Sequence, residues 1–553
     1  MESSVKATKK TSFVQGAAIL GIAGLLVKII GAVYRIPLAN IVGKTGMSYY
    51  EVAYPYYSWL LVISSAGLPT AISKLVSERI ALGDVAGAKK VFRSAMRLLF
   101  IIGVATTILL FAASGGIAKL SGAPEAMYSL MALSPALFFV SIMCAYRGYL
   151  QGMQCMTGTA LSQLAEQFVK LIIGFSLAAM FIKSHPDRPE LAAMGALIGV
   201  SISELAALGV IVGYYLVRMK RGTLPVCLPG RNVTQQATLS EITKKLLLIA
   251  IPITIGASIM PVTGIADSIF IINILRGRGI ASGLSYEAAA DAAKGAYAVL
   301  RSYVTPLINM PAVLTLALSM SLVPAISHAV TRRERRTVNS ASRTGIKLAM
   351  FIGAPCAAGL FVLGGPIMAL LFRDVRNDEA TFLLAQKVMY FAAIGVLFLS
   401  LVQTLTGIIQ GIGKPRVPVY FLAVGGVVKV VSMIILMRFT RLGILGAAIS
   451  TVLCYAIAGI GDTIYVIKKT GMSLSYEDTF FKPIAASLLM GFIVFVVYSF
   501  ARTLGHPTVG TLAAIVVGIA VYIAAMILMR PFSASDLEFL PKSRLVAKLF
   551  RIN

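Results

Sequence analysis

The 553-residue chain is poor in charged residues, above all in acidic ones. Asp, Glu, Lys and Arg together make up 13% of the sequence, and 22 acidic side chains stand against 50 basic ones. A typical soluble domain has about 25% charged residues. The chain therefore lacks the polar side chains needed to cover a water-exposed surface of this size, which excludes an ordinary soluble globular fold.

Residue types that carry most enzyme and metal chemistry are also scarce. The three histidines (His185, His328 and His506) are far apart, and the five cysteines form no CxxC pair. Neither residue type indicates a catalytic or metal-binding cluster. There is no HExxH motif, and the stretch 411–415 (GIGKP) lacks the spacing and the Ser/Thr of a phosphate-binding loop. We therefore expect no enzyme activity, no cofactor and no bound metal.

Long apolar blocks dominate what is present. Hydrophobic residues make up 58% of the chain, and its mean hydropathy is +0.86. About 20 apolar residues are needed to cross a bilayer as a helix, and the blocks are continuous rather than alternating, which excludes a barrel. Such blocks lie near 14–34, 52–73, 95–115, 127–147, 159–182, 191–217, 246–275, 297–325, 347–372, 381–408, 416–437, 442–467, 481–501 and 508–529. The sequence predicts an all-α, polytopic membrane protein of about 14 transmembrane helices.

The net charge of +28 arises from the connections between these blocks. In a soluble protein this charge would suggest nucleic acid as a partner, but here the basic residues lie at membrane edges. Lys and Arg are more frequent in every second connection, those on the side of the N-terminus, and such loops stay cytoplasmic. We therefore expect a cell-membrane protein with both termini in the cytoplasm and no nucleic-acid partner.

An internal repeat divides the chain. Gly148, Gln151, Gly152, Val169 and Lys170 recur at an offset of 259 as Gly407, Gln410, Gly411, Val428 and Lys429; separately, residues 71–73 (AIS) recur as residues 325–327. Predicted helices 1–6 thus repeat as helices 7–12 in the same direction, which is typical of transporters with two lobes around a substrate site. We predict an N-terminal lobe over 1–235 and a C-terminal lobe over 236–470. The remaining 471–553 forms two further helices and a basic tail.

Ionisable side chains inside the predicted helices are candidates for the site, because each costs about 2.5–3.5 kcal/mol or more in hydrocarbon. They are Lys28, Arg35, Glu51, Glu166, Lys170 and Glu204 in the first lobe, and Asp267, Arg301, Lys387, Lys429 and Asp462 in the second. Basic residues outnumber acidic ones, so the pattern predicts a cationic cavity for a substrate that is anionic at one end and apolar at the other.

Two lysines at equivalent repeat positions differ in their surroundings. Glu166 and Lys170 are four residues apart and can pair on one helix face, either as a purely structural pair or within a cavity. Gly425 replaces the glutamate in the second lobe. Lys429 therefore either extends to a membrane edge or faces the cavity and meets an anion.

Five tyrosines cluster around the start of the second apolar block: Tyr49, Tyr50, Tyr54, Tyr56 and Tyr57. Tyrosine is enriched at membrane–water interfaces. We expect the cluster to mark such an interface, with stacking on a sugar as the alternative.

Several stretches resemble a known family. They are 31–38 (GAVYRIPL), 67–78 (GLPTAISKLVSE), 147–152 (RGYLQG) and 162–167 (SQLAEQ). Together they are similar to the lipid II flippase and stage V sporulation protein B branch of the multidrug/oligosaccharidyl-lipid/polysaccharide (MOP) exporter superfamily. The resemblance covers nearly the whole chain. It implies alternating access, outward movement of a lipid-linked cell-wall precursor such as lipid II, and an apolar groove at the last two helices for the polyprenyl tail.

The resemblance also implies roles for particular residues. Lys28 and Arg35 match basic residues of the family's first helix and Arg301 one near the eighth; with Lys429 they form the predicted substrate-binding set. Glu51, Arg147, Glu166, Lys170, Glu204 and Asp267 are the cavity or coupling candidates. The implied partners are a lipid-linked oligosaccharide, membrane lipids and a coupling ion (H⁺ or Na⁺), and we expect a monomer. Some relatives carry an arginine pair in helix 2, which is missing here before Lys74 and leaves other lipid-linked glycans open as substrates.

Two other functional classes remain. In a cation-coupled multidrug exporter, Glu166, Glu204 and Asp267 would carry protons or sodium ions, although the excess of basic residues argues against a cationic substrate. A membrane-embedded glycan-processing enzyme is the third class, and no motif in the sequence favours it.

Overall fold

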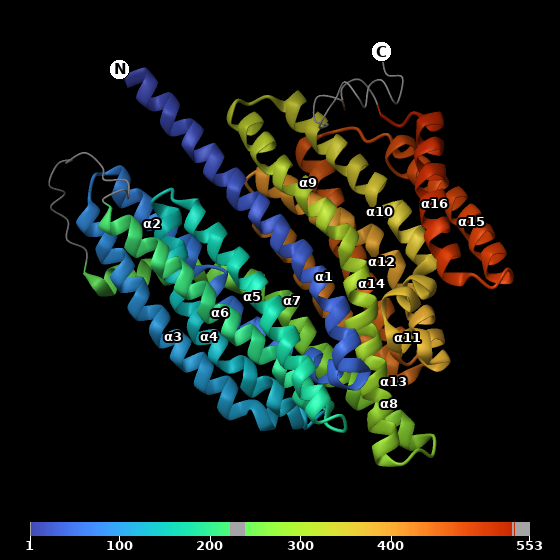
Figure 1. Ribbon diagram of the computed structural model, residues 1–553. Helices are drawn as coiled ribbons and strands as arrows, with labels where there is room; N and C mark the ends of the chain where they lie inside the picture. The colour runs from blue at the N-terminus through green and yellow to red at the C-terminus, as the bar shows by residue number, and fades with distance from the viewer. Residues whose placement is uncertain (1, 222–237, 533–535, 537–553) are drawn as a thin grey trace. The chain divides into compact units, whose positions relative to one another are not determined.

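The computed structural model describes residues 2–221, 238–532 and 536, and in this part of the chain every regular element is helical (Figure 1). The chain folds as two compact units, residues 1–273 and 274–553. The first unit contains α1 (Glu2–Ser65), α2 (Leu68–Ala81), α3 (Val85–Leu120), α4 (Ala126–Gly152), α5 (Met156–Ser184), α6 (Pro189–Lys220) and most of α7 (Leu239–Ala281).

The second unit contains the rest of α7 and the remaining helices. These are α8 (Tyr286–Ala298), a π-helical turn (Val299–Val304), α9 (Thr305–Thr331), α10 (Arg335–Leu371), α11 (Arg373–Asn377), α12 (Glu379–Gly411), α13 (Arg416–Phe439), α14 (Ile444–Thr470), a second π-helical turn (Glu477–Phe481), α15 (Lys482–Thr503) and α16 (Pro507–Met529). The predicted boundary at residue 235 precedes α7, whereas the compact units divide within this helix. The three-part division, which follows the repeat, stays a prediction.

The described residues form 13 helical spans that are long and apolar enough to cross a membrane, and these confirm the polytopic all-α fold. Twelve of them coincide one to one with predicted blocks. The difference from the predicted 14 lies in α1, whose 64 residues contain the first block and most of the second. Gly43 breaks this helix with φ 74° and ψ 171°, a conformation that glycine adopts without steric cost. The two arms of α1 therefore account for the two predicted helices.

Close glycine contacts recur in the two units. In the first, a Cβ on Gly103 of α3 would lie 2.9 Å from the Cβ of Ser141 on α4; in the second, a Cβ on Gly353 of α10 would lie 2.9 Å from the Cβ of Ser400 on α12. The two serines are 259 residues apart, which is the offset read from the sequence. Each unit on its own thus contains the same close helix pair, and this supports the predicted duplication.

A second contact of this kind joins different helices. Gly148 of α4 packs on Ile72 of α2, and Gly411 of α12 packs on Ile326 of α9, in each case with 2.9 Å between the added Cβ and the isoleucine Cβ. Small residues at such positions let transmembrane helices approach closely. The repeated letters Gly148–Gly152 and Gly407–Gly411 are therefore packing residues.

The appended helices α15 and α16 pack on α10 in the second unit through an apolar cluster that includes Leu363, Met490, Tyr522 and Phe532. After α16, a left-handed residue, Arg530, turns the chain. Asp536 then lies fully buried against α10. Its carboxylate is 2.9 Å from Nζ of Lys347 and accepts a hydrogen bond from Thr344 at 2.7 Å. Lys347 also donates to the carbonyl of Pro531 at 3.0 Å.

Candidate functional site

The break at Gly43 brings two predicted site residues together. Arg35 lies on the first arm of α1 and Glu51 on the second, and Nη1 of Arg35 is 3.1 Å from Oε1 of Glu51. Glu51 is fully buried, whereas the arginine side chain is 23% exposed. The guanidinium also lies 5.7 Å from the ring centre of Tyr54, within the range of a cation–π interaction. Arg35 is thus held between a carboxylate and an aromatic ring.

The expected pair of Glu166 with Lys170 is wrong. Glu166 of α5 is instead 3.1 Å from Nη2 of Arg147 on α4, and Gln167 donates to its other carboxylate oxygen at 3.1 Å. Nε of Arg147 donates to Ser162 at 3.1 Å. A planar guanidinium fixed by a second hydrogen bond is a better partner for a carboxylate than a flexible ammonium group, which explains why the neighbouring helix supplies the cation.

Lys170 has a different environment. Its ammonium group lies 5.2 Å from the ring centre of Tyr34 on α1, and that ring stacks on Phe175 of α5 at 4.9 Å. Among the described residues Lys170 forms no ion pair. It is therefore a half-buried cation that an aromatic face stabilises without neutralising it.

The tyrosines do not mark a membrane interface. Tyr49, Tyr50, Tyr56 and Tyr57 are all less than 10% exposed. Tyr54 is stacked on Tyr50 at 5.7 Å and tilted against Tyr57 at 5.9 Å, and the hydroxyl of Tyr56 hydrogen-bonds to the hydroxyl of Ser121 at 2.9 Å. Buried hydroxyl groups find partners inside the unit, so the tyrosine-rich block belongs to the interior and the predicted interfacial role is wrong.

Together these contacts form one site, which we call the α1–α4–α5–α6 network. It contains three basic side chains (Arg35, Arg147 and Lys170), three acidic ones (Glu51, Glu166 and Glu204) and tyrosines between them. Glu204 of α6 is buried and interacts electrostatically with Glu166, Arg147 and Lys170. The formal charges in the network balance. The predicted excess of positive charge is therefore absent from this cluster, and Lys170 supplies its accessible cationic group.

The remaining predicted residues take no part in the contacts described for this network. Lys28 is exposed on α1, and Asp267 is buried on α7 within the first unit. In the second unit Arg301 is half-buried in the first π-helical turn, and Lys429 is 6% exposed on α13. The burial of Lys429 contradicts its extension to a membrane edge.

Two further intramembrane charges differ in exposure. Lys387 is exposed on α12, whereas Asp462 is fully buried on α14 and both its carboxylate oxygens lack a hydrogen-bond partner. No group of three or more His, Cys, Asp or Glu side chains that could hold a metal occurs within the described ranges.

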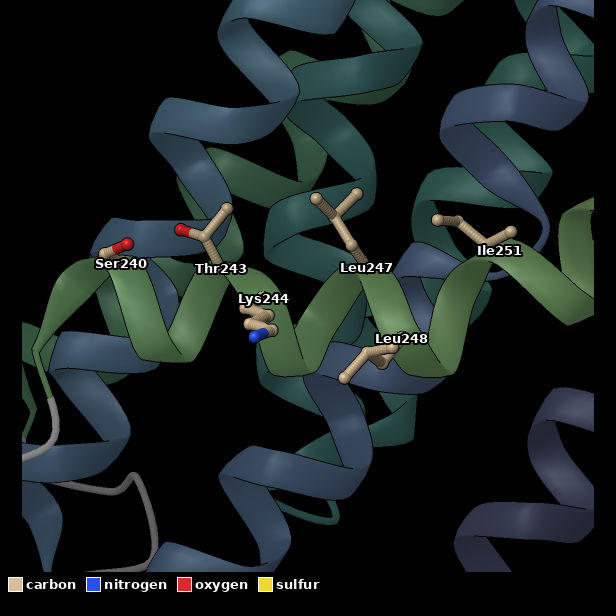
Figure 2. A pocket seen from close by; sticks show the side chains of 6 residues that line it. All are labelled: Ser240, Thr243, Lys244, Leu247, Leu248 and Ile251. Atoms are coloured by element: carbon tan, nitrogen blue, oxygen red, sulfur yellow. The ribbon is translucent and has the colours of Figure 1, made fainter.

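Some participants were not identified from the sequence. Tyr34, Ser162 and Gln167 belong to the network, yet single polar or aromatic residues in an apolar block give no signal of their own. A hollow of about 500 Å³ on α7 was also not expected; it is open and lined by Ser240, Thr243, Lys244, Leu247, Leu248 and Ile251 (Figure 2). Its lining comes from one helix face and has no convergent polar groups, so it adds nothing to the site.

The sequence is similar to known protein families and to individual proteins. The profile described as polysaccharide biosynthesis protein matches residues 13–330, and that described as lipid II flippase MurJ matches residues 257–518. The uncharacterized membrane protein YabM of Bacillus subtilis is 28% identical over 547 residues, which are 97% of this chain and 96% of that protein. Lipid II flippase MurJ of the same organism is 25% identical over 476 residues, 84% of each chain.

A solved structure shows the same fold. Lipid II flippase MurJ in an inward closed conformation superimposes with a TM-score of 0.68, over 93% of this chain and 99% of that one, at 17% identity. The first family profile covers more than half of the sequence. The chain therefore belongs to the polysaccharide biosynthesis protein family.

Proposed function

We propose that this protein is a flippase that moves a polyprenyl-pyrophosphate-linked cell-wall saccharide, specifically lipid II, from the inner to the outer leaflet by alternating access. Both termini are then cytoplasmic. The observation that carries this proposal is the α1–α4–α5–α6 network, a set of buried charges held within one unit of a chain from a flippase family. Because charges inside a membrane-spanning segment are costly, a cluster of six charged side chains, of which Glu51 and Glu204 are buried, indicates a pathway for a polar group.

Arg35 is preorganised to receive an anionic group. Its 3.1 Å contact with Glu51 and its position over Tyr54 fix the guanidinium before a substrate arrives. A fixed fork of donors is well suited to phosphate oxygens. Glu51 thus acts as a positioning residue for Arg35.

Lys170 offers the complementary feature, a cation with no ion pair among the described residues and an aromatic ring beneath it. Approach of a phosphate would give this ammonium group a counter-charge that it lacks in the free protein. With Lys28 as a further contact in the same unit, Arg35 and Lys170 would bind the pyrophosphate and the adjoining sugars. Arg301 and Lys429 of the second unit stay predicted substrate contacts.

Complementation of cells depleted of their own lipid II flippase tests the proposal. We expect wild-type protein to restore growth, and Arg35→Ala, Lys28→Ala or Lys170→Ala to abolish rescue at equal membrane abundance. Lys387→Ala is the matched control, because this lysine is also intramembrane by sequence but lies outside the proposed substrate-binding set, and it should retain rescue. Absence of rescue by well-expressed wild-type protein would favour another lipid-linked glycan as substrate.

One observation favours a second candidate, a cation-coupled exporter. Oε2 of Glu204 is buried without a hydrogen-bond partner, which suits a carboxylate that binds and releases a proton during transport. Efflux of cationic dyes that is lost in Glu204→Gln, with Arg35→Ala unaffected, would support this function over the flippase.

A further inference from the structure

A pocket of about 600 Å³ lies in the second unit. Its walls come from α10, α12 and α15, so it lies where the appended hairpin meets the repeated helices. It is at the end of α15 near Thr503, opposite the end held by Asp536. Since both termini are cytoplasmic in the proposed orientation, the pocket lies at the level of the outer leaflet. The volume is in the range of specific small-ligand sites, about 300–1,000 Å³.

Glycines bring the walls together. A Cβ on Gly365 of α10 would lie 3.1 Å from the side chain of Gln386 on α12. On the other side, Gly491 of α15 faces Val362 of α10, with 3.7 Å between its added Cβ and the valine methyl carbon. The pocket is therefore built into close helix contacts, and its shape does not depend on a loop.

Five of the eleven lining residues are aromatic. The rings of Phe361 and Tyr390 are 5.1 Å apart, and Phe382, Phe495 and Tyr498 complete the aromatic lining. Phe361 is 45% exposed and Phe495 57% exposed. Because large apolar side chains with this exposure face lipid in a membrane-spanning helix, the pocket can be entered sideways from the bilayer.

The polar groups gather at one end. Nε2 of Gln386 donates to the hydroxyl of Tyr390 at 2.6 Å, and Ser499 and Arg502 lie on α15. The lining contains no acidic residue, and Arg502 forms no ion pair with any described carboxylate. Arg502 is the one charged side chain among the lining residues that the structure describes. The pocket is thus matched to a ligand with a single negative charge.

We propose that this pocket binds one anionic phospholipid of the outer leaflet, with its phosphodiester at Arg502 and part of an acyl chain against Phe361 and Phe495. A neutral lipid would leave Arg502 without a counter-charge. A polyprenyl pyrophosphate carries more negative charge than the single arginine of the lining can balance. The site is therefore separate from the path of the transported lipid, and the inference does not depend on which saccharide is moved.

Native mass spectrometry of the full-length protein tests this, with phosphatidylglycerol and phosphatidylcholine of identical acyl chains added in equal amounts. We expect wild-type protein to retain phosphatidylglycerol preferentially. Arg502→Gln should reduce that preference about tenfold, because a hydrogen bond to a charged group is worth roughly 1.5–3 kcal/mol. Arg438→Gln, another exposed arginine in the last turn of a helix of this unit, should leave it unchanged.

A filling variant tests the pocket itself. Ser499→Trp places an indole in the cavity and should lower retention of both lipids, whereas Val496→Trp, on the exposed face of the same helix, should not. Equal preference in wild type and Arg502→Gln, or unchanged retention in Ser499→Trp, would overturn the proposal. Displacement of phosphatidylglycerol by polyprenyl phosphate at equal concentration would also overturn it, by assigning the pocket to the transported lipid.

Discussion

The two repeated units share their helix packing but differ in where they keep charge. Gly103 on Ser141 and Gly353 on Ser400 are the same contact made twice. The ion pair of Arg147 with Glu166 has no such copy, because Thr406 and Gly425 stand 259 residues further on. In the second unit a fully buried pair, Lys347 with Asp536, instead attaches the C-terminal segment. Close helix contacts thus persisted through duplication, whereas the charges diverged.

This difference has a physical reason. A glycine under a neighbouring helix cannot gain a side chain without moving backbone, so each copy retains it. Both members of a charge pair can be replaced by smaller neutral residues at little cost, because no charge is then left buried without a partner. The first unit therefore has an ion pair, Arg147 with Glu166, at positions where the second unit has neutral residues.

The largest effect on stability is expected at the pair of Lys347 with Asp536. Lys347→Met leaves a fully buried carboxylate without its ammonium partner, which costs about 3–5 kcal/mol. Thermal unfolding of the purified protein measures this as a lower midpoint. Replacing both residues, Lys347→Met with Asp536→Leu, should recover much of the loss. A double variant as unstable as the single one would show that the pair is not the cause.

The shared packing should respond equally in both units. Gly103→Val and Gly353→Val each force a side chain into a serine 2.9 Å away, and overpacking of this kind costs about 1–3 kcal/mol. Gly116→Val, with nothing within 4 Å of its added Cβ, is the control and should be neutral. A large loss in one unit and none in the other would contradict a common packing motif.

The charge pair should respond in one unit alone. Arg147→Met and Glu166→Gln, singly and together, should give a coupling energy of about 0.5–3 kcal/mol in a double-mutant cycle. The corresponding cycle with Thr406→Val and Gly425→Ala should give a coupling near zero. The energies are obtained from the unfolding midpoints of the detergent-solubilised protein. Equal coupling in both units would contradict an ion pair that is present in the first unit and missing from the second.

The smallest effect on stability is expected for the contact of Lys170 with Tyr34. Tyr34→Leu removes a cation–π interaction worth about 0.5–2 kcal/mol. If Lys170 binds the substrate, the same change should nevertheless abolish complementation, because the ammonium group loses its position. Tyr34→Phe retains the ring and should retain both properties. Normal transport by Tyr34→Leu would remove Lys170 from the site.

Much of the fold could be predicted from the sequence, because crossing a bilayer requires long apolar blocks that are visible without any structure. All the predicted spans are found in the helices, and the repeat appeared as an offset of letters before any contact was known. The charged candidates could also be identified, since ionisable residues in such blocks are rare. The pairing of these charges could not be predicted. Glu166 has Lys170 one turn away in the sequence, but its partner in the structure is Arg147 on the neighbouring helix.

The sequence by itself determined that this protein is a duplicated bundle of membrane helices, because hydrophobic length and periodic repetition are local properties of the chain. Tertiary structure alone decided which charges meet. The turn at Gly43 joins Arg35 to Glu51, the buried tyrosines separate the charges, and the C-terminal segment carries Asp536 to Lys347 across 189 positions of sequence. Such contacts depend on how helices that are distant in the sequence pack together, and local sequence patterns do not predict this packing.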